Sequence, residues 1–206
     1  SIVYRDVVAR NNIRNTAFLE QLILFLAQHT GSLFSVKSIS DFLKSRKINI
    51  AHNQVQSYLK ALTDAFLIDR IPRWDVKGKR IFETGEKFYF EDTGIRNVIA
   101  GYSPADRGKV LENVVYNHLL FCGYDVKVGR FDKYEIDFVA SKSGEKKYVQ
   151  VALSLDNERT IEREFGNLLE LQDNYPKMVV SMDKAFPNTR LGIRHVPLRE
   201  FLANEE

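Results

Sequence analysis

The hydrophobic pattern in the N-terminal half predicts helices first and strands afterwards. Apolar residues recur at three- and four-residue spacing in two long segments, 16–29 and 52–65, with polar residues between them. Between these segments, Ser35 stands at an N-cap position in front of a third, shorter amphipathic segment. The extended segments that follow are 67–75, 81–84 and 87–90, with a basic turn at 77–80. A helix-turn-helix followed by a hairpin predicts a winged helix over residues 1–100.

The C-terminal half has a different order of patterns. Its predicted elements are a helix at 106–121, strands at 124–128, 135–140 and 147–152, a helix at 158–172, a strand at 177–181, a short strand at 193–196 and a terminal helix through Leu202. Short links between the first three strands predict hairpins, whereas the helix before the fourth strand lets it lie parallel to its partner. The predicted fold class is therefore α/β of the α+β type, with a second domain at 101–206 that begins in a Gly- and Pro-containing stretch.

The amino-acid composition excludes several classes of protein. The chain has 206 residues, of which 44% are hydrophobic and 28% charged, and this excludes wholesale disorder. Cys122 is the single cysteine, which excludes an internal disulfide or a thiolate-rich zinc site and is typical of a reducing, cytoplasmic setting. No run of about 18 apolar residues occurs, and residues 1–15 lack the apolar core of a signal peptide, so we expect no membrane partner.

The net charge of +3 is unevenly distributed along the chain. Residues 1–101 contain 15 basic and 10 acidic residues, whereas residues 102–206 contain 15 basic and 17 acidic ones. Basic residues concentrate in the predicted wing, where they can lie along a phosphate backbone. The nucleic-acid-binding candidates on the third helix and the wing are Asn53, Gln54, Ser57, Lys60, Arg73, Lys77, Lys79 and Arg80. The alternative is that these charges only keep a hairpin soluble, and that the winged helix binds a protein.

Acidic residues on the predicted strands of the second domain supply the candidate chemistry. Glu135 and Asp137 alternate with apolar neighbours on one strand, and Gln150 and Ala152 share a face of the next. Glu112 lies close to the apolar stripe of the preceding helix. Without further information, this alternation is also what an ordinary half-exposed strand shows. We interpret the charged run at 158–165 as part of a helix that Glu–Arg pairs at three- and four-residue spacing stabilise.

The order of elements and these residues resemble the PD-(D/E)XK nuclease superfamily, an αβββαβ fold. The resemblance implies a Mg²⁺ site that activates water, held by a helix glutamate, a strand acid and a second acid, with a lysine one residue beyond it. The matching positions are Glu112, Asp137, Gln150 and Ala152, with Glu135 as an additional acid. Gln150 thus replaces the second acid and Ala152 replaces the lysine, which implies a degenerate catalytic and metal site.

The whole chain resembles the C-terminal region of a bacterial and archaeal family of AAA-type ATPases. The matching stretches include 4–10, 55–62, 77–80, 108–113, 134–138, 148–152 and 173–177. By this resemblance, an ATPase module that binds ATP precedes Ser1 in the same polypeptide. No G-x-x-x-x-G-K-[ST] sequence occurs in the 206 residues, so we expect no ATP hydrolysis and no cofactor in this part.

Two functions of different classes remain open. The first is a non-catalytic module that binds DNA or a protein partner through the winged helix, with the nuclease-like domain as a platform that can also self-associate into a homodimer. The second is a Mg²⁺-dependent DNA nuclease with a relaxed site at Glu112, Asp137 and Gln150. Whether the chain is an enzyme is left open. No Cys or Ser partner is evident for His118 or His195, so triad chemistry is not expected.

Overall fold

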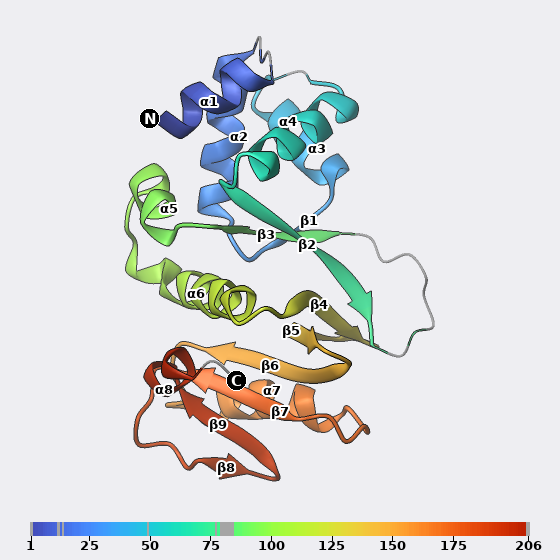
Figure 1. Ribbon diagram of the computed structural model, residues 1–206, viewed down its shortest axis with the longest axis vertical. Coiled ribbons are helices and arrows are strands. Elements are labelled where there is room, and N and C mark those ends of the chain that lie inside the picture. The colour runs from blue at the N-terminus through green and yellow to red at the C-terminus, as the bar shows by residue number, and fades with distance from the viewer. Residues whose placement is uncertain are drawn as a thin grey trace. The chain divides into compact units, whose positions relative to one another are not determined.

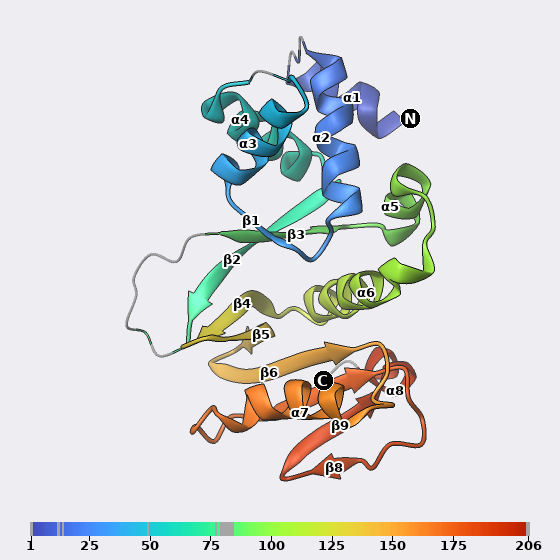
Figure 2. The same cartoon turned by 180° about the vertical axis from the view of Figure 1, so that it is seen from behind.

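The computed structural model describes residues 2–11, 13, 15–48, 50–76, 78 and 85–204. The chain forms two compact units, one made of residues 1–71 and 84–102 and the other of residues 72–83 and 103–206. The division crosses strand β2 (Ile68–Asp75) between Ile71 and Pro72, so the beginning of the predicted wing groups with the first unit and its continuation with the second. The molecule is an α+β protein with mixed parallel and antiparallel strand pairs (Figures 1 and 2).

Helices dominate the first unit. They are α1 (Ile2–Arg10), α2 (Thr16–Gln28), α3 (Val36–Ser45), α4 (His52–Asp64) and α5 (Thr93–Ala100). The short strand β1 (Leu33–Phe34) pairs antiparallel with β3 (Glu86–Phe90). Apolar side chains of α2, α3 and α4 pack with Phe88 and Phe90 of β3 into one buried core. The predicted helices at 16–29, after Ser35 and at 52–65 are confirmed; α1, β1 and α5 were not predicted.

Local signals in the sequence explain where these helices begin. Asn15 accepts the Phe18 N–H at 3.0 Å in front of α2. Ser35 and Ser38 form a reciprocal capping box at the start of α3, in which each side chain accepts the other's main-chain N–H. Asp92 accepts the N–H groups of Gly94 and Ile95 at the start of α5. These caps satisfy the main-chain donors that the first turn of a helix leaves without partners.

A mixed sheet forms the second unit. Its strand order is the second part of β2, then β4 (Asp125–Phe131), β5 (Tyr134–Lys142), β6 (Glu145–Ala152), β7 (Lys177–Ser181), β9 (Ile193–Pro197) and β8 (Thr189–Arg190). The pairs β4–β5 and β5–β6 are antiparallel, as the short links predict, and β6–β7 is parallel after the crossover helix α7 (Glu158–Leu169). Strand β8 was not predicted.

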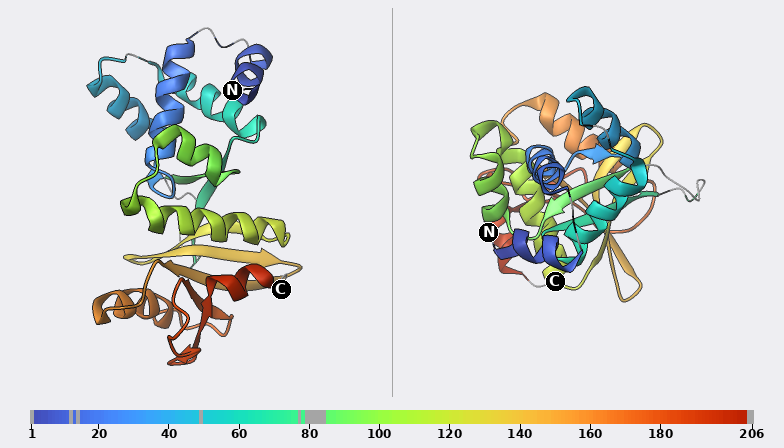
Figure 3. Two further views of the ribbon diagram at one scale, coloured as in Figure 1. Left: turned by 90° about the vertical axis from the view of Figure 1, so that its left-hand side faces the viewer. Right: turned by 90° about the horizontal axis from the view of Figure 1, so that it is seen from above.

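Helices cover both faces of this sheet (Figure 3, left). On one face lies α7, whose Ile161, Phe165 and Leu168 pack on Tyr148 and Ala152 of β6. The other face carries α6 (Arg107–Phe121), which follows the short 3₁₀ helix η1 (Pro104–Asp106), together with the terminal helix α8 (Leu198–Ala203). Residues 146, 148, 150 and 152 of β6 therefore point toward α7, because side chains alternate along a strand.

Candidate functional site

The candidate site lies where β5 and β6 part. The paired register of these strands runs from Lys142↔Glu145 to Phe138↔Val149. Beyond that point, side-chain oxygens accept the main-chain N–H groups of the opposite strand. The Asp137 N–H donates to Gln150 Oε1 at 2.6 Å, and the Val151 N–H donates to Asp137 Oδ2 at 2.9 Å. Asp137 and Gln150, which the resemblance pairs, thus lie in direct contact, and each accepts a main-chain hydrogen bond from the opposite strand.

Gln150 has a second partner that the sequence analysis missed. Its Nε2 donates to Glu164 Oε2 at 2.9 Å, and the Gln150 and Glu164 residues are only 3% and 4% exposed. The other oxygen of Glu164 accepts from the Arg163 guanidinium, at 2.9 Å from Nε, while the Arg163 side chain is itself largely exposed. The Gln150 amide therefore links the β5 main chain to a buried carboxylate on α7.

Glu112 occupies α6 and is half-buried. Burial raises the pKa of the Glu164 carboxyl; the Arg163 guanidinium and the Gln150 amide act in the opposite direction, and repulsion from Glu112 adds to the rise. Glu112 therefore lies within electrostatic range of Glu164. The structure brings Asp137, Gln150 and Glu164 into one hydrogen-bonded cluster, and Glu112 acts on that cluster through its charge.

These residues do not fit the metal site that the resemblance implies. Across the described part of the chain, no three His, Cys, Asp or Glu side chains are grouped so that they could hold a metal ion. The amide oxygen of Gln150, the expected ligand, already accepts the Asp137 N–H. The nearby acid Glu135 pairs with Arg73 at 3.2 Å, and Ala152 is buried in the α7-facing core where the lysine of the motif would stand.

The signal that could have identified Glu164 is its position on the helix. The residues at 161, 164, 165 and 168 recur at three- and four-residue spacing, so Glu164 stands in the middle of an apolar stripe. An acid on the core-facing side of a helix is expensive to bury unless it is paired. The surrounding charges at Glu158, Glu162 and Arg163 conceal this exception, because together they are typical of an ordinary exposed helix.

The predicted nucleic-acid-binding residues divide into three groups. Asn53, Gln54, Ser57 and Lys60 are all exposed on α4, as expected, although Lys60 pairs with Asp64 at 2.6 Å. Arg73 belongs to the second unit, where Glu135 neutralises it. Lys77, Lys79 and Arg80 lie outside the described residues. The face of α4 therefore presents amides and a hydroxyl, with its one predicted cation already paired.

Two histidines have the neighbours that the sequence analysis did not find. His195 Nε2 lies 2.8 Å from Ser181 Oγ, and His118 Nε2 lies 3.4 Å from Cys122 Sγ. Ser181 and His195 are buried, and Asp183 contacts the serine rather than the imidazole, so the arrangement differs from a catalytic triad. The Asn204 carbonyl accepts from His118 Nε2 at 3.0 Å, so this nitrogen carries a proton and cannot take one from the thiol.

Comparison with known proteins assigns the chain to a family. Residues 1–106, just over half of the chain, match a domain of unknown function, DUF8612. The chain belongs to the DUF8612 family. A protein of Haemophilus influenzae is 38% identical over 181 residues, which are 88% of this chain and 44% of that protein. A protein of Methanocaldococcus jannaschii is 32% identical over 167 residues, 79% of this chain and 36% of that protein. Both are described as uncharacterized, and the chain spans less than half the length of each.

Solved structures resemble this DUF8612 protein only distantly. Can2 from Sulfobacillus thermosulfidooxidans, in complex with cyclic tetra-adenylate, has a TM-score of 0.30 and 16% identity, with 93% of this chain and 50% of that chain covered. A protein of Vibrio cholerae has a TM-score of 0.33 and 12% identity, with 98% and 52% covered. At these scores, neither likeness assigns a fold or an activity. Among the described residues, no helix combines the length and apolar character that a membrane span requires.

Proposed function

We propose that the chain is a non-catalytic DNA-binding module of a longer AAA-type ATPase polypeptide. In this proposal, residues 1–100 act as a winged helix and the second unit is a nuclease-like domain whose metal site has been replaced by a hydrogen-bonded cluster. The observation that carries the non-catalytic part is Gln150, whose amide oxygen accepts the Asp137 N–H while its nitrogen binds Glu164. An amide held on both sides cannot supply the charge that activates water on a metal.

The DNA-binding part rests on the exposed face of α4. Asn53, Gln54 and Ser57 are exposed on the helix that follows the capped helix α3, the position of a recognition helix in a helix-turn-helix. Amide side chains can bond to the edge of adenine, and hydroxyls to several base edges, in the major groove. The excess of basic residues in 1–101 would supply the phosphate attraction. The ATPase part is supported by the resemblance and by relatives more than twice as long as the matched segment.

Titration of the full chain with duplex DNA at low and moderate salt tests the binding. We expect binding that weakens steeply with salt, because phosphate contacts release counterions. A triple variant, Asn53→Ala, Gln54→Ala and Ser57→Ala, should weaken binding, whereas Asn188→Ala, an exposed amide of the second unit, should not. Absence of binding at low salt would exclude DNA and leave a protein partner as the ligand of the first unit.

A Mg²⁺-dependent nuclease is the second candidate. The observation in its favour is that Glu164 is a further acid in the cluster of Asp137 and Gln150. The negative charge of Glu112 also lies close enough to raise the pKa of Glu164. Incubation of supercoiled plasmid with the chain and Mg²⁺ or Mn²⁺ separates the two candidates. The non-catalytic proposal expects no nicking. Nicking that disappears in the Asp137→Ala variant would establish the nuclease instead, while nicking that the variant retains would come from a contaminating enzyme.

A further inference from the structure

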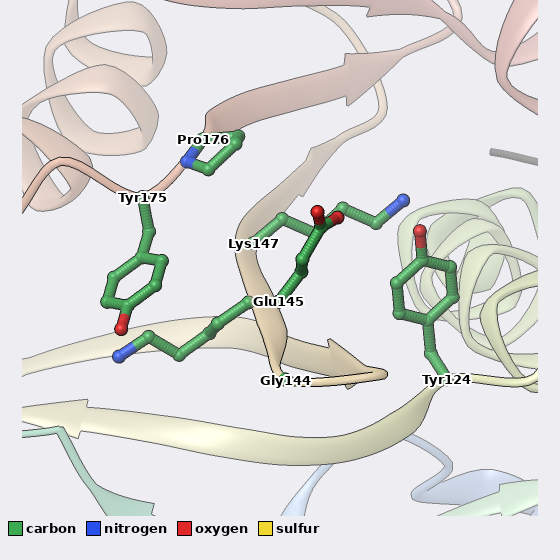
Figure 4. Close-up of a pocket in the computed structure, with 7 residues that line it drawn as sticks. Tyr124, Gly144, Glu145, Lys147, Tyr175 and Pro176 are labelled. Atoms are coloured by element: carbon green, nitrogen blue, oxygen red, sulfur yellow. The ribbon is translucent and has the colours of Figure 1, made fainter.

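A pocket of about 360 Å³ lies at the end of the second unit's sheet, away from the Gln150 cluster along β6. Its walls are residues 144–147, at the turn and start of β6, together with Tyr124, Tyr175 and Pro176. Figure 4 shows Tyr175 and Tyr124 on opposite sides of the strand, with the Lys147 side chain directed toward Tyr124. Pockets that bind small ligands in proteins start at roughly this size, about 300 Å³.

Aromatic rings surround the ammonium group of Lys146. Its Nζ lies 4.0 Å from the centre of the Tyr175 ring and 5.1 Å from the ring centres of both Trp74 and Tyr148. The acid paired with it is Asp173, at 3.9 Å, which also accepts from the Tyr148 hydroxyl at 2.5 Å. Burial lowers the pKa of Lys146, and Asp173 opposes that change. The ring contacts hold the lysine in place but use none of its N–H donors, which can therefore bind an anion.

The opposite side of the pocket repeats this combination of a lysine and a tyrosine. Lys147 Nζ lies 4.0 Å from the centre of the Tyr124 ring, and Lys142 Nζ lies 5.4 Å from the same ring. The pocket lining itself contains two cations, Lys146 and Lys147, and one acid, Glu145, so its own charge balance is positive. A tyrosine lies on each side of the strand that carries these residues.

We propose that this pocket binds a nucleoside phosphate, with the base stacked on Tyr175 and the phosphate bound by Lys146. Tyr175 is 42% exposed, so its ring is available to a base, whereas Tyr148 is fully buried and its hydroxyl is committed to Asp173. Aromatic rings beside lysines are the combination that binds bases together with their phosphates. Glu145 can accept hydrogen bonds from sugar hydroxyls or from an exocyclic amine. The site is separate from α4 and does not depend on duplex binding there.

The test uses the full chain, with Trp74 as the reporter. Trp74 is the sole tryptophan and contacts Lys146, so its fluorescence reports on the pocket. Adenosine 5′-monophosphate and a short single-stranded oligodeoxyadenylate are titrated in parallel, and equilibrium dialysis measures binding independently. Quenching by both probes, or by the mononucleotide alone, indicates a free nucleotide site. Quenching by the oligonucleotide alone indicates a site for a nucleotide within a strand. Each of these results supports the proposal.

Variants decide whether the binding occurs in the pocket. Tyr175→Ala removes the stacking ring and should weaken binding about tenfold or more, whereas Tyr175→Phe keeps the ring and should retain it. Lys146→Gln should weaken binding, while Lys184→Gln, an exposed lysine of the same unit, should not. The triple variant of α4 should also bind both probes normally. The proposal is overturned if neither probe binds, or if Tyr175→Ala and Lys146→Gln bind as tightly as the native chain.

Discussion

Gln150 uses both ends of its side-chain amide in the buried cluster. Where the resembling nucleases have a second acid, this chain has an amide that donates and accepts at once. It therefore bonds to a main-chain N–H on one side and to the Glu164 carboxylate on the other. An acid at this position would face Glu164 with like charge, which is unfavourable in a buried site. An amide at position 150 therefore avoids like-charge repulsion with Glu164.

Replacement of Gln150 by Ala should destabilise the second unit. The change leaves the Asp137 N–H without its acceptor and removes a donor from a buried carboxylate, so we expect a decrease in stability of about 2–4 kcal/mol. Urea unfolding followed by Trp74 fluorescence measures this decrease, because Trp74 belongs to the second unit. Gln56→Ala removes an exposed amide of α4 and should change stability by less than about 0.5 kcal/mol. Equal effects of the two variants would contradict a bridging role for Gln150.

The Glu91 carboxyl of the first unit should make the stability of that unit depend on pH. Partial burial, together with the neighbouring charge and hydrogen bond of Asp69, raises the pKa of Glu91 from 4.5 to about 7. The folded state therefore retains a proton between pH 4.5 and about 7 that the unfolded state has released. Because the folded state binds more protons there, the free energy of unfolding falls as pH rises through this window and levels off above it.

The Glu91→Gln variant should remove this pH dependence, because an amide keeps its hydrogen bond to Asp69 and does not titrate. Circular dichroism at 222 nm, which reports the helices of the first unit strongly, follows urea unfolding at a series of pH values. Glu20→Gln changes an exposed acid of α2 and serves as the control. A slope between pH 4.5 and about 7 that is the same in Glu91→Gln and the native chain would show that the Glu91–Asp69 pair is not its origin.

At the scale of elements, the sequence predicted what strong periodicity and capping determine. The helices α2, α3, α4, α6 and α7 have apolar stripes, and the hairpin strands β4, β5 and β6 alternate, so each was found within a few residues of its bounds. The missed elements are short or lack that signal. Helix α5 has eight residues, and the buried residue among them is an arginine, Arg96. The Arg96 Nε donates to the Ala27 carbonyl at 2.7 Å. In sequence, an arginine is typical of the surface rather than the interior.

The candidate site was predicted only in part, for a related reason. Asp137 and Gln150 lie on adjacent strands, and their contact follows from the strand order. Glu164 comes from a helix 14 positions beyond Gln150 in the chain, and its contact depends on how α7 packs on the sheet. Only the tertiary structure specifies that packing. Sequence reasoning also could not anticipate that main-chain N–H groups occupy the oxygens expected to bind a metal.

Two glycines of the second unit should respond in opposite ways to substitution by alanine. A Cβ at Gly129 of β4 would lie 2.8 Å from Val139 Cγ2 and 2.9 Å from Ile136 Cβ, which is too close for packed atoms. Gly129→Ala should therefore destabilise by about 1–3 kcal/mol. Gly166 lies within α7 with no atom near its Cβ position, so Gly166→Ala should stabilise by up to about 1 kcal/mol through helix propensity.

Urea unfolding followed by Trp74 fluorescence measures both glycine variants under the same conditions. The pair controls for composition, since each variant adds one methyl group to the same unit. If Gly129→Ala were neutral, the close approach of β4 to β5 at the register shift between Lys127 and Gly129 would not constrain this position. If Gly166→Ala were destabilising, the space beside α7 would be filled in solution by a neighbouring segment.

The molecule as a whole consists of two units with separate cores. Membership of the DUF8612 family rests on residues 1–106, which cover the first unit, whereas the hydrogen-bonded cluster and the lysine–tyrosine pocket belong to the second. The exposed face of α4 therefore lies in the first unit and the proposed nucleotide pocket in the second.

Charge removal at matched positions tests whether duplex binding follows local or total charge. Replacing Lys77, Lys79 and Arg80 by Gln takes the net charge from +3 to 0, and so does replacing Lys133, Lys184 and Arg199, which are exposed in the second unit. If the wing contacts phosphates, the first triple variant should make the plot of log binding constant against log salt concentration less steep. The slope should decrease in magnitude by about 0.9 for each phosphate that the variant no longer neutralises, or by nearly three if all three contacts are lost. The second should leave the slope unchanged. Equal reductions would mean that DNA responds to the total charge of the protein, and a winged helix would then not be needed to explain its binding.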